Sequence, residues 1–178
     1  MSDGAKLTLR ALLGIVLSRY RLSIEGIHGV HHWGRVMENG RRLAPLNGAD
    51  LSVVEVFAIL HDACRQSDGL DHGHGPRAAA LARSLRAETG LDERQFAQLL
   101  AACSCHTRGP GRDADATILT CLDADRLDIP RVGMRIRTEL LFTPPARDPR
   151  MVEWAGARAA GLVVPCVGAE EWGIGHSR

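Results

Sequence analysis

The feature that most constrains the fold is an apolar run over residues 53–60, which ends directly on the ionisable pair His61 and Asp62. Placed on a helix, these apolar side chains cover most of its circumference, and a helix that is apolar all round lies at the centre of a domain. A short polar loop follows and brings two more histidines, His72 and His74. The sequence therefore predicts a buried central helix that ends on an ionisable pair, with further imidazoles close behind it.

The rest of the chain is predicted to form helices joined by short loops, because no run alternates apolar and polar residues as a strand would. Ser52 and Glu55 have the spacing of a capping box for the central helix, and Asp92 suits the start of a later helix. Pro76 and Gly90 suit the first turn and the end of the helix between them. Helices are expected over residues 6–22, 31–44, 49–64, 77–89, 91–106 and 114–130, with a break near Gly40 left open.

The chain of 178 residues has the length of one domain, and 45% of its residues are apolar, as in globular proteins with a buried core. We expect an all-α helical bundle over residues 1–148. From residue 144 the sequence is rich in proline and glycine and holds one short helix candidate. Residues 149–178 are therefore predicted to form an irregular C-terminal extension, which packs on the core or trails from it.

Charge and composition argue against several classes of partner. The formal net charge is +1 and aromatic residues make up 4% of the chain, so we expect no binding of nucleic acid polymers. The apolar run over residues 11–17 is too short to span a membrane. The five cysteines are odd in number and irregularly spaced, which is typical of reduced thiols in a cytoplasmic protein. The oligomeric state is left open, with a homodimer as one option.

Six potential metal ligands lie at or near predicted helix ends. Imidazole nitrogen together with carboxylate oxygen suits Mn, Fe, Co, Ni or Zn, and suits Mg less well. His61 and Asp62 are adjacent on a helix, so their side chains diverge by about a third of a turn and can reach one ion from neighbouring directions. A divalent ion would also compensate the charge of Asp62 in an apolar surrounding. The six residues are His32, His61, Asp62, His74, His106 and Asp125.

Three motifs occur in a fixed order on the predicted helices, namely "HHWGRV", "AILHDAC" and "LDADRLD". Together they resemble the motifs of the HD-domain superfamily of metal-dependent phosphohydrolases, over roughly residues 25–135. The residues around them are similar to those of a subgroup of small bacterial HD proteins. The resemblance implies an HD-domain-like helical bundle. It also implies His32, His61, Asp62 and Asp125 as the ligands of one divalent ion, with Asp123 as the second choice for the last ligand.

Two further histidines match positions that some HD proteins use. His74, in "HGPRAA", and His106, in "CSCHTRG", resemble histidines that hold a second ion in two-metal members and face the substrate phosphate in one-metal members. The bridging glutamate or additional histidine of the best two-metal pattern is not evident. One ion is therefore expected, and a second is left open. His28 is interpreted as a loop residue or a support for a ligand, and His72 as a solvated residue.

Arginines accompany each of these motifs although the chain as a whole is nearly neutral. Guanidinium groups match phosphate oxygens bidentately, so the pattern predicts a locally positive mouth for an anion. Arg35 is expected to take part in catalysis, whereas Arg65, Arg77 and Arg126 are expected to contact phosphate or support a second ion. The arginines concerned are Arg35, Arg65, Arg77, Arg108 and Arg126.

The resemblance implies metal-assisted hydrolysis of a small phosphorylated molecule, a nucleotide or a related phosphoester. In such a mechanism an ion activates a water molecule and polarises a phosphoryl oxygen. Asp62, if only loosely coordinated, or a histidine would accept the proton. His74 and the arginines would stabilise the charge that develops on the phosphate.

Two alternatives from other functional classes stay open. An HD-type di-iron oxygenase would need two bound irons and oxygen-dependent turnover. A non-catalytic regulatory module would bind metal or nucleotide without turnover. Hydrolases of guanosine alarmones usually carry long extra segments, and hydrolases of cyclic dinucleotides carry a Gly-Tyr-Pro signature. Neither feature occurs in this sequence.

Overall fold

The computed structural model describes residues 3–167 and 171–172, with only the backbone of residues 3–8, and every regular element in these ranges is helical. The predicted all-α fold is therefore confirmed. The elements are α1 (Asp3–Leu17), α2 (Val30–Asn47), α3 (Leu51–Leu60), α4 (His74–Ser84), η1 (Ala87–Thr89), α5 (Glu93–Cys105), α6 (Ala116–Arg126), η2 (Ile129–Val132), η3 (Thr138–Leu140), α7 (Pro144–Arg147) and α8 (Pro149–Ala160).

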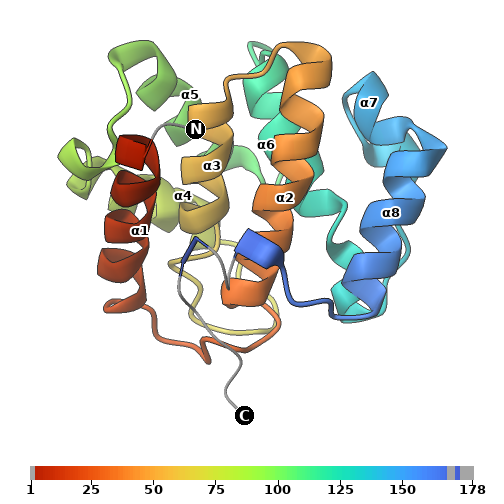
Figure 1. The fold of residues 1–178 in the computed structure, drawn as a ribbon, viewed down its shortest axis with the longest axis horizontal. Helices are drawn as coiled ribbons and strands as arrows, with labels where there is room; N and C mark the ends of the chain where they lie inside the picture. Colours follow the sequence, from red (N-terminus) through yellow and green to blue (C-terminus); the bar gives the residue numbers. More distant parts are fainter. Residues whose placement is uncertain (1–2, 168–170, 173–178) are drawn as a thin grey trace.

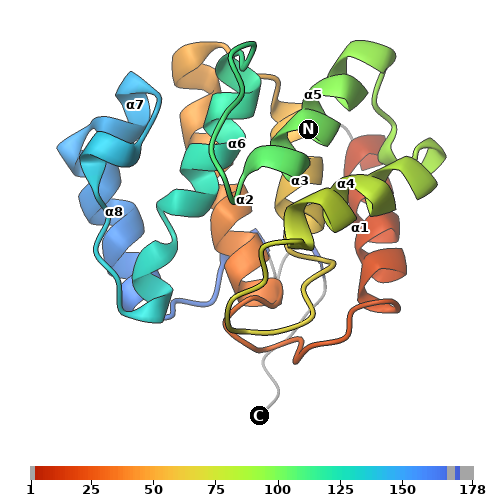
Figure 2. The ribbon, with the colours of Figure 1, turned by 180° about the vertical axis from the view of Figure 1, so that it is seen from behind.

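Helix α3 lies at the centre of the bundle and packs against α1, α2, α4, α5 and α6 (Figures 1 and 2). The side chains of residues 53–60 are buried on all sides of the helix, as the apolar run predicted, and Phe57 is completely enclosed. The predicted capping box is wrong. Asp50 begins the helix by accepting a hydrogen bond from the backbone N–H of Ser52, while Glu55 lies one turn further in and pairs with Arg41 at 2.7 Å.

Helix α2 runs unbroken through Gly40, so the break left open by the sequence does not occur. A Cβ atom at Gly40 would lie 2.2 Å from Cγ1 of Val54, and the glycine therefore lets α2 and α3 approach closely. Asn39, one residue earlier, donates a hydrogen bond of 2.9 Å to the backbone oxygen of Ala124. These contacts fix α2 against both α3 and α6.

Helices α4 and α5 pack against each other on the face of the molecule that Figure 2 shows. Asp92 caps α5 in a capping box with Gln95, which confirms the predicted helix start. Pro76 lies in the first turn of α4, also as predicted. Gly90 does not end α4, because that helix stops at Ser84, and Gly90 instead ends the short η1 with a φ of 65°.

The last helices form a smaller second core beside the main bundle. Helix α8 packs against η2, α7 and α2, on the side of the molecule away from α1 (Figure 1). The division of the chain at residue 148 stays a prediction. The buried apolar residues of this second core are Leu43, Leu127, Leu141, Ala146, Met151 and Ala155.

Asp123 fastens this second region to α6. Its buried carboxylate accepts hydrogen bonds from the backbone N–H of Phe142, from the backbone N–H of Thr143 and from the Thr143 hydroxyl, at 2.7 to 2.8 Å. Burial raises the pKa of Asp123, against the opposing effect of these three donors. The carboxylate thus holds in place the segment that leads into α7.

No helix in the part of the chain that the structure describes is long and apolar enough to cross a membrane.

The loss of Asp123 is expected to destabilise the fold strongly. Asp123→Ala leaves buried donors at Thr143 without an acceptor, and should lower the free energy of unfolding by about 2–4 kcal/mol in urea titrations. Asp113→Ala removes an exposed carboxylate and should change it by less than about 0.5 kcal/mol. Equal unfolding midpoints for the two variants would contradict the role given to Asp123.

Candidate metal centre

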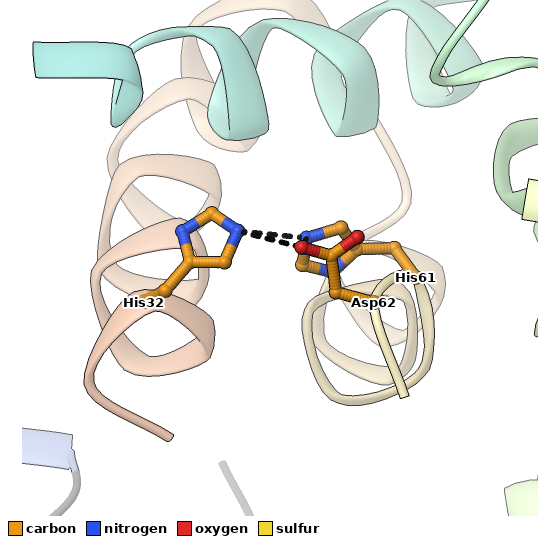
Figure 3. Close-up of side chains that lie close together, drawn as sticks. All are labelled: His32, His61 and Asp62. Carbon is orange, nitrogen blue, oxygen red and sulfur yellow. Dashed lines mark hydrogen bonds and ion pairs between the residues drawn. The ribbon is translucent and has the colours of Figure 1, made fainter. Parts of the chain in front are cut away.

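The ends of five helices bring the six candidate ligands to one place in the bundle. His32 lies in the first turn of α2, His61 and Asp62 end α3, His74 begins α4, His106 ends α5, and Asp125 lies in the last turn of α6. Figure 3 shows His32 on α2 pointing directly at the His61 and Asp62 pair. All but Asp125 are buried, and the Asp125 side chain is 20% exposed.

A first group of ligand atoms surrounds Nε2 of His32. This nitrogen lies 3.1 Å from Nε2 of His61 and 3.5 Å from Oδ2 of Asp62 (Figure 3). Oδ1 of Asp125 lies 3.5 Å from Nε2 of His32 and 3.7 Å from Nε2 of His61. Two imidazole nitrogens and two carboxylate oxygens therefore converge on one point, and His32, His61 and Asp62 are close enough to hold a metal ion.

A second group of ligand atoms lies on the other side of the same carboxylate. Oδ1 of Asp62 lies 3.1 Å from Nε2 of His74 and 3.7 Å from Nε2 of His106. The two imidazole nitrogens are 2.8 Å apart, and the three residues are again close enough to hold a metal ion. Asp62 thus turns one oxygen toward each group.

Hydrogen bonds fix the tautomer of all four histidines. In each ring Nδ1 faces an oxygen that can only accept, so Nδ1 carries the proton and Nε2 of the neutral ring presents a lone pair. Each pair of facing Nε2 atoms would then bring two lone pairs together at about 3 Å, which is repulsive unless a cation lies between them. The oxygen partners are Asp128 for His32 (2.7 Å), Ala58 for His61 (3.1 Å), Asp71 for His74 (2.6 Å) and Cys103 for His106 (2.8 Å).

The electrostatics of the centre also favour a bound cation. Burial lowers the pKa of His61 to about 3, against the opposing effect of Asp62 and Asp125, so this imidazole is neutral. Burial raises the pKa of Asp62, but the charge of His61 and then the close contacts with His106, His32 and His74 outweigh burial and lower the pKa well below the usual range. Burial lowers the pKa of His106, but its contact with Asp62 and the charge of Asp125 outweigh burial and raise the pKa. A neutral imidazole at His61 beside an ionised carboxylate at Asp62 is the protonation state in which both residues can bind a metal ion.

Asp128 supports the first group from behind. Its carboxylate accepts from Nδ1 of His32 and also from Arg35, at 2.7 Å from Nε and 3.1 Å from Nη2. Burial raises the pKa of Asp128, but His32 and Arg35 outweigh this effect and lower it. The sequence reasoning missed Asp128, although it is the last acidic residue of "LDADRLD".

Arg35 does not lie where the sequence reasoning placed it. Its side chain is buried, with 3% of the residue exposed, and it donates hydrogen bonds to Asp128 and to the backbone oxygen of Val163. These contacts commit the guanidinium to orienting His32. The expectation that Arg35 contacts a substrate is therefore corrected: it is a positioning residue.

Three of the four other predicted arginines line one of two cavities. Arg65 places Nη1 3.7 Å from Oδ1 of Asp62, whereas Arg77 pairs with Asp71 at 2.5 Å. Both line a cavity of about 230 Å³ together with Arg19 and Arg21. Arg126 instead lines a larger cavity of about 470 Å³ that reaches Asp125 and His106. Arg108 is exposed and lines neither of these two cavities.

The remaining candidates are resolved by their contacts. Asp123 is committed to Phe142 and Thr143, so Asp125 is the carboxylate of α6 that faces the histidines. His72 is exposed, as predicted. His28 is buried, pairs with Asp68 at 3.0 Å and lines the larger cavity.

Comparison with known proteins identifies one informative relative. The crystal structure of a predicted HD superfamily hydrolase from an uncultured Thermotogales bacterium matches with a TM-score of 0.62 and 28% sequence identity. The match covers 86% of this chain and 88% of that one. No protein-family model and no curated protein matches the sequence. Because the ordered motifs, the helical fold and this nearly full-length match agree, the chain belongs to the HD-domain superfamily.

Proposed function

We propose that this protein is a metal-dependent phosphohydrolase that acts on a small phosphorylated substrate. The observation that carries the proposal is the pair of facing imidazole groups, in which four Nε2 lone pairs converge on the two oxygens of Asp62. The likeness to a protein described as a predicted HD superfamily hydrolase supports the same reaction class.

His32, His61, Asp62 and Asp125 would hold the first ion, and Asp62, His74 and His106 offer a position for a second. A divalent ion bound there would act as a Lewis acid on a phosphoryl oxygen and make water nucleophilic at neutral pH. The mixed nitrogen and oxygen donors favour Mn, Fe, Co, Ni or Zn over Mg.

The substrate phosphate would approach from the side of Asp125, the one partly exposed member of the first group. The larger cavity reaches this carboxylate, and its wall carries Arg126 and Arg131. Their guanidinium groups would attract the phosphate and offset the charge that builds up on it in the transition state. Arg126 retains the phosphate-binding role expected from the sequence.

Asp62 and His74 keep the catalytic roles expected from the sequence if only the first position is filled. Oδ1 of Asp62 and Nε2 of His74 are 3.1 Å apart beside that position, where the pair can pass a proton to or from the reacting oxygen. If the second position were also filled, His74 and the second oxygen of Asp62 would be ligands as well, and a water molecule would have to accept the proton instead.

One observation favours a second candidate function, the HD-type di-iron oxygenase. Asp62 lies between two groups that could each hold an ion, as a two-metal centre requires. Iron-loaded protein that consumes oxygen in the presence of an organic phosphate, while manganese-loaded protein releases no inorganic phosphate, would favour the oxygenase.

Metal analysis tests the ligand assignment. Protein purified without chelator should hold about one to two transition-metal ions per chain, and His61→Ala and Asp62→Ala should lose them, because each removes a ligand from the first group. His74→Ala should affect only the second position. His72→Ala is the matched control and should keep the wild-type content. A wild-type protein that takes up none of the five metals after reconstitution would refute the proposal.

Replacement of Asp128 tests the support behind His32. Asp128→Asn keeps the shape but removes the charge that fixes the His32 ring and balances Arg35, so metal affinity should fall by about 10–100-fold in chelator competition. Asp113→Asn, at an exposed position, should leave the affinity unchanged. Equal affinities of Asp128→Asn and wild type would exclude this role.

A panel of phosphoesters tests the reaction. The metal-loaded enzyme should release phosphate or alcohol from nucleotides, sugar phosphates, alkyl phosphates or bis-nitrophenyl phosphate, and His61→Ala should lower kcat/KM by at least about 10³-fold. Tight metal binding without turnover of any ester would instead favour the non-catalytic module.

A further inference from the structure

The cavity of about 470 Å³ beside the metal centre has two chemically different ends. Its inner end is formed by His28, His106 and Asp125, which belong to or adjoin the centre. Its outer wall is built by η2, η3 and the segments that join them to the neighbouring helices. A cavity of this volume lies in the usual range of small-molecule sites.

Apart from its arginines, the outer wall is aliphatic. Three of its side chains are unusually exposed for their type, with 57% of Met134, 45% of Leu140 and 39% of Val132 accessible to solvent. Such exposed apolar side chains around a cavity indicate a binding surface, because burying each of them against an apolar ligand would be energetically favourable. The aliphatic side chains of the wall are Ile129, Val132, Met134, Ile136, Leu140 and Leu141.

Four arginines line the cavity: Arg126, Arg131, Arg135 and Arg137. Arg135 and Arg137 are exposed, and Arg137 pairs with Glu139 at 2.8 Å, whereas Arg126 and Arg131 are held by contacts within the wall. Arg131 is held by the backbone oxygens of Ile27 and Asp128, at 2.8 and 3.2 Å. Arg126 donates to the backbone oxygen of Leu140 at 2.5 Å and lies over the ring of Phe142. Arg126 has neutral partners, and Nε of Arg131 lies 3.9 Å from the carboxylate of Asp128, beyond hydrogen-bonding distance, so both charges remain available to an anion near Asp125.

The lining offers little to a nucleobase. Among the described residues that line the cavity there is no phenylalanine, tyrosine or tryptophan, and the aromatic stacking that proteins use to hold bases is therefore absent from its wall. Thr107 is the only lining residue with a neutral hydroxyl or amide side chain in this part of the chain. Apart from its arginines, whose donors suit a phosphate, the wall thus matches an apolar group better than a ring edge rich in hydrogen-bonding atoms.

We propose that the substrate is a phosphomonoester with an aliphatic body, which places its phosphate at Asp125 and His106 and its hydrocarbon part against Met134, Ile136 and Leu140. This inference rests on the proposed phosphohydrolase function and narrows it from small phosphorylated molecules to alkyl or isoprenoid-like monoesters. In the reaction, the P–O bond to the aliphatic alcohol breaks and a new P–O bond to the water oxygen forms. The alcohol oxygen takes up one proton, so the products are the alcohol and inorganic phosphate.

The test measures binding separately from turnover. Dissociation constants of non-hydrolysable alkylphosphonates, from methyl to octyl, are determined by calorimetry on the metal-loaded protein. Each added methylene should tighten binding about two- to fourfold until the cavity is filled. The same protein is then assayed for hydrolysis of the corresponding alkyl phosphates and of nucleoside monophosphates.

Substitutions locate the effect. Met134→Ser and Leu140→Ser should flatten the dependence of affinity on chain length. Leu46→Ser, a matched change at an exposed leucine that does not line the cavity, should preserve the wild-type slope. Measured metal content of all three variants should equal that of the wild type, because none of these side chains contacts the metal-ligand groups.

The outcomes separate the two proposals. A chain-length slope that the two cavity variants flatten supports the aliphatic substrate. Phosphonate affinity that does not depend on chain length, or stronger turnover of nucleoside monophosphates than of octyl phosphate, overturns it while the phosphohydrolase function stands. A steep slope in binding with no hydrolysis of any ester overturns the phosphohydrolase function but keeps the aliphatic ligand class.

Discussion

The structure depends on the carboxylate of Asp62, which is buried between two pairs of imidazoles and turns one oxygen toward each. An ionised carboxylate in this position is costly unless positive charge reaches it. Arg65 approaches one oxygen at 3.7 Å, but no described arginine or lysine approaches the other. The centre of the bundle therefore favours the binding of a cation beside Asp62. The surrounding helices hold the candidate ligand side chains in place around that position.

Close backbone approach makes this arrangement possible. A Cβ atom at Gly75 would lie 2.7 Å from the backbone oxygen of Cys103, so the glycine lets the start of α4 meet the end of α5. The same contact sets His74 beside His106, at 2.8 Å. Gly40 has the same effect between α2 and α3, which carry His32 and His61. Gly40 and Gly75 thus allow close helix packing and also bring the candidate ligand histidines together.

The sequence predicted the features that depend on local residue patterns. The apolar circumference of residues 53–60 identified the central helix, and the three motifs in order identified the superfamily. It could not predict Asp128, because that role depends on a hydrogen bond to a histidine 96 positions earlier. The position of Arg35 was predicted wrongly for a related reason. An arginine one turn from a candidate ligand can point toward the substrate cavity or toward a buried carboxylate such as Asp128, and only the packed structure shows which. The cap at Asp50 was missed because Ser52 and Glu55 had a matching spacing.

The candidate ligands come from helix ends distributed between α2 and α6, and this has a consequence for how the protein matures. During synthesis the chain emerges from its N-terminus, so the carboxylate on α6 becomes available only after most of the bundle has been made. Neither imidazole pair exists as a pair until distant helices have packed. An ion bound by these groups would therefore be captured late, after the helices have assembled. Because such an ion would bind only the folded form, it would raise the free energy of unfolding as its concentration increases.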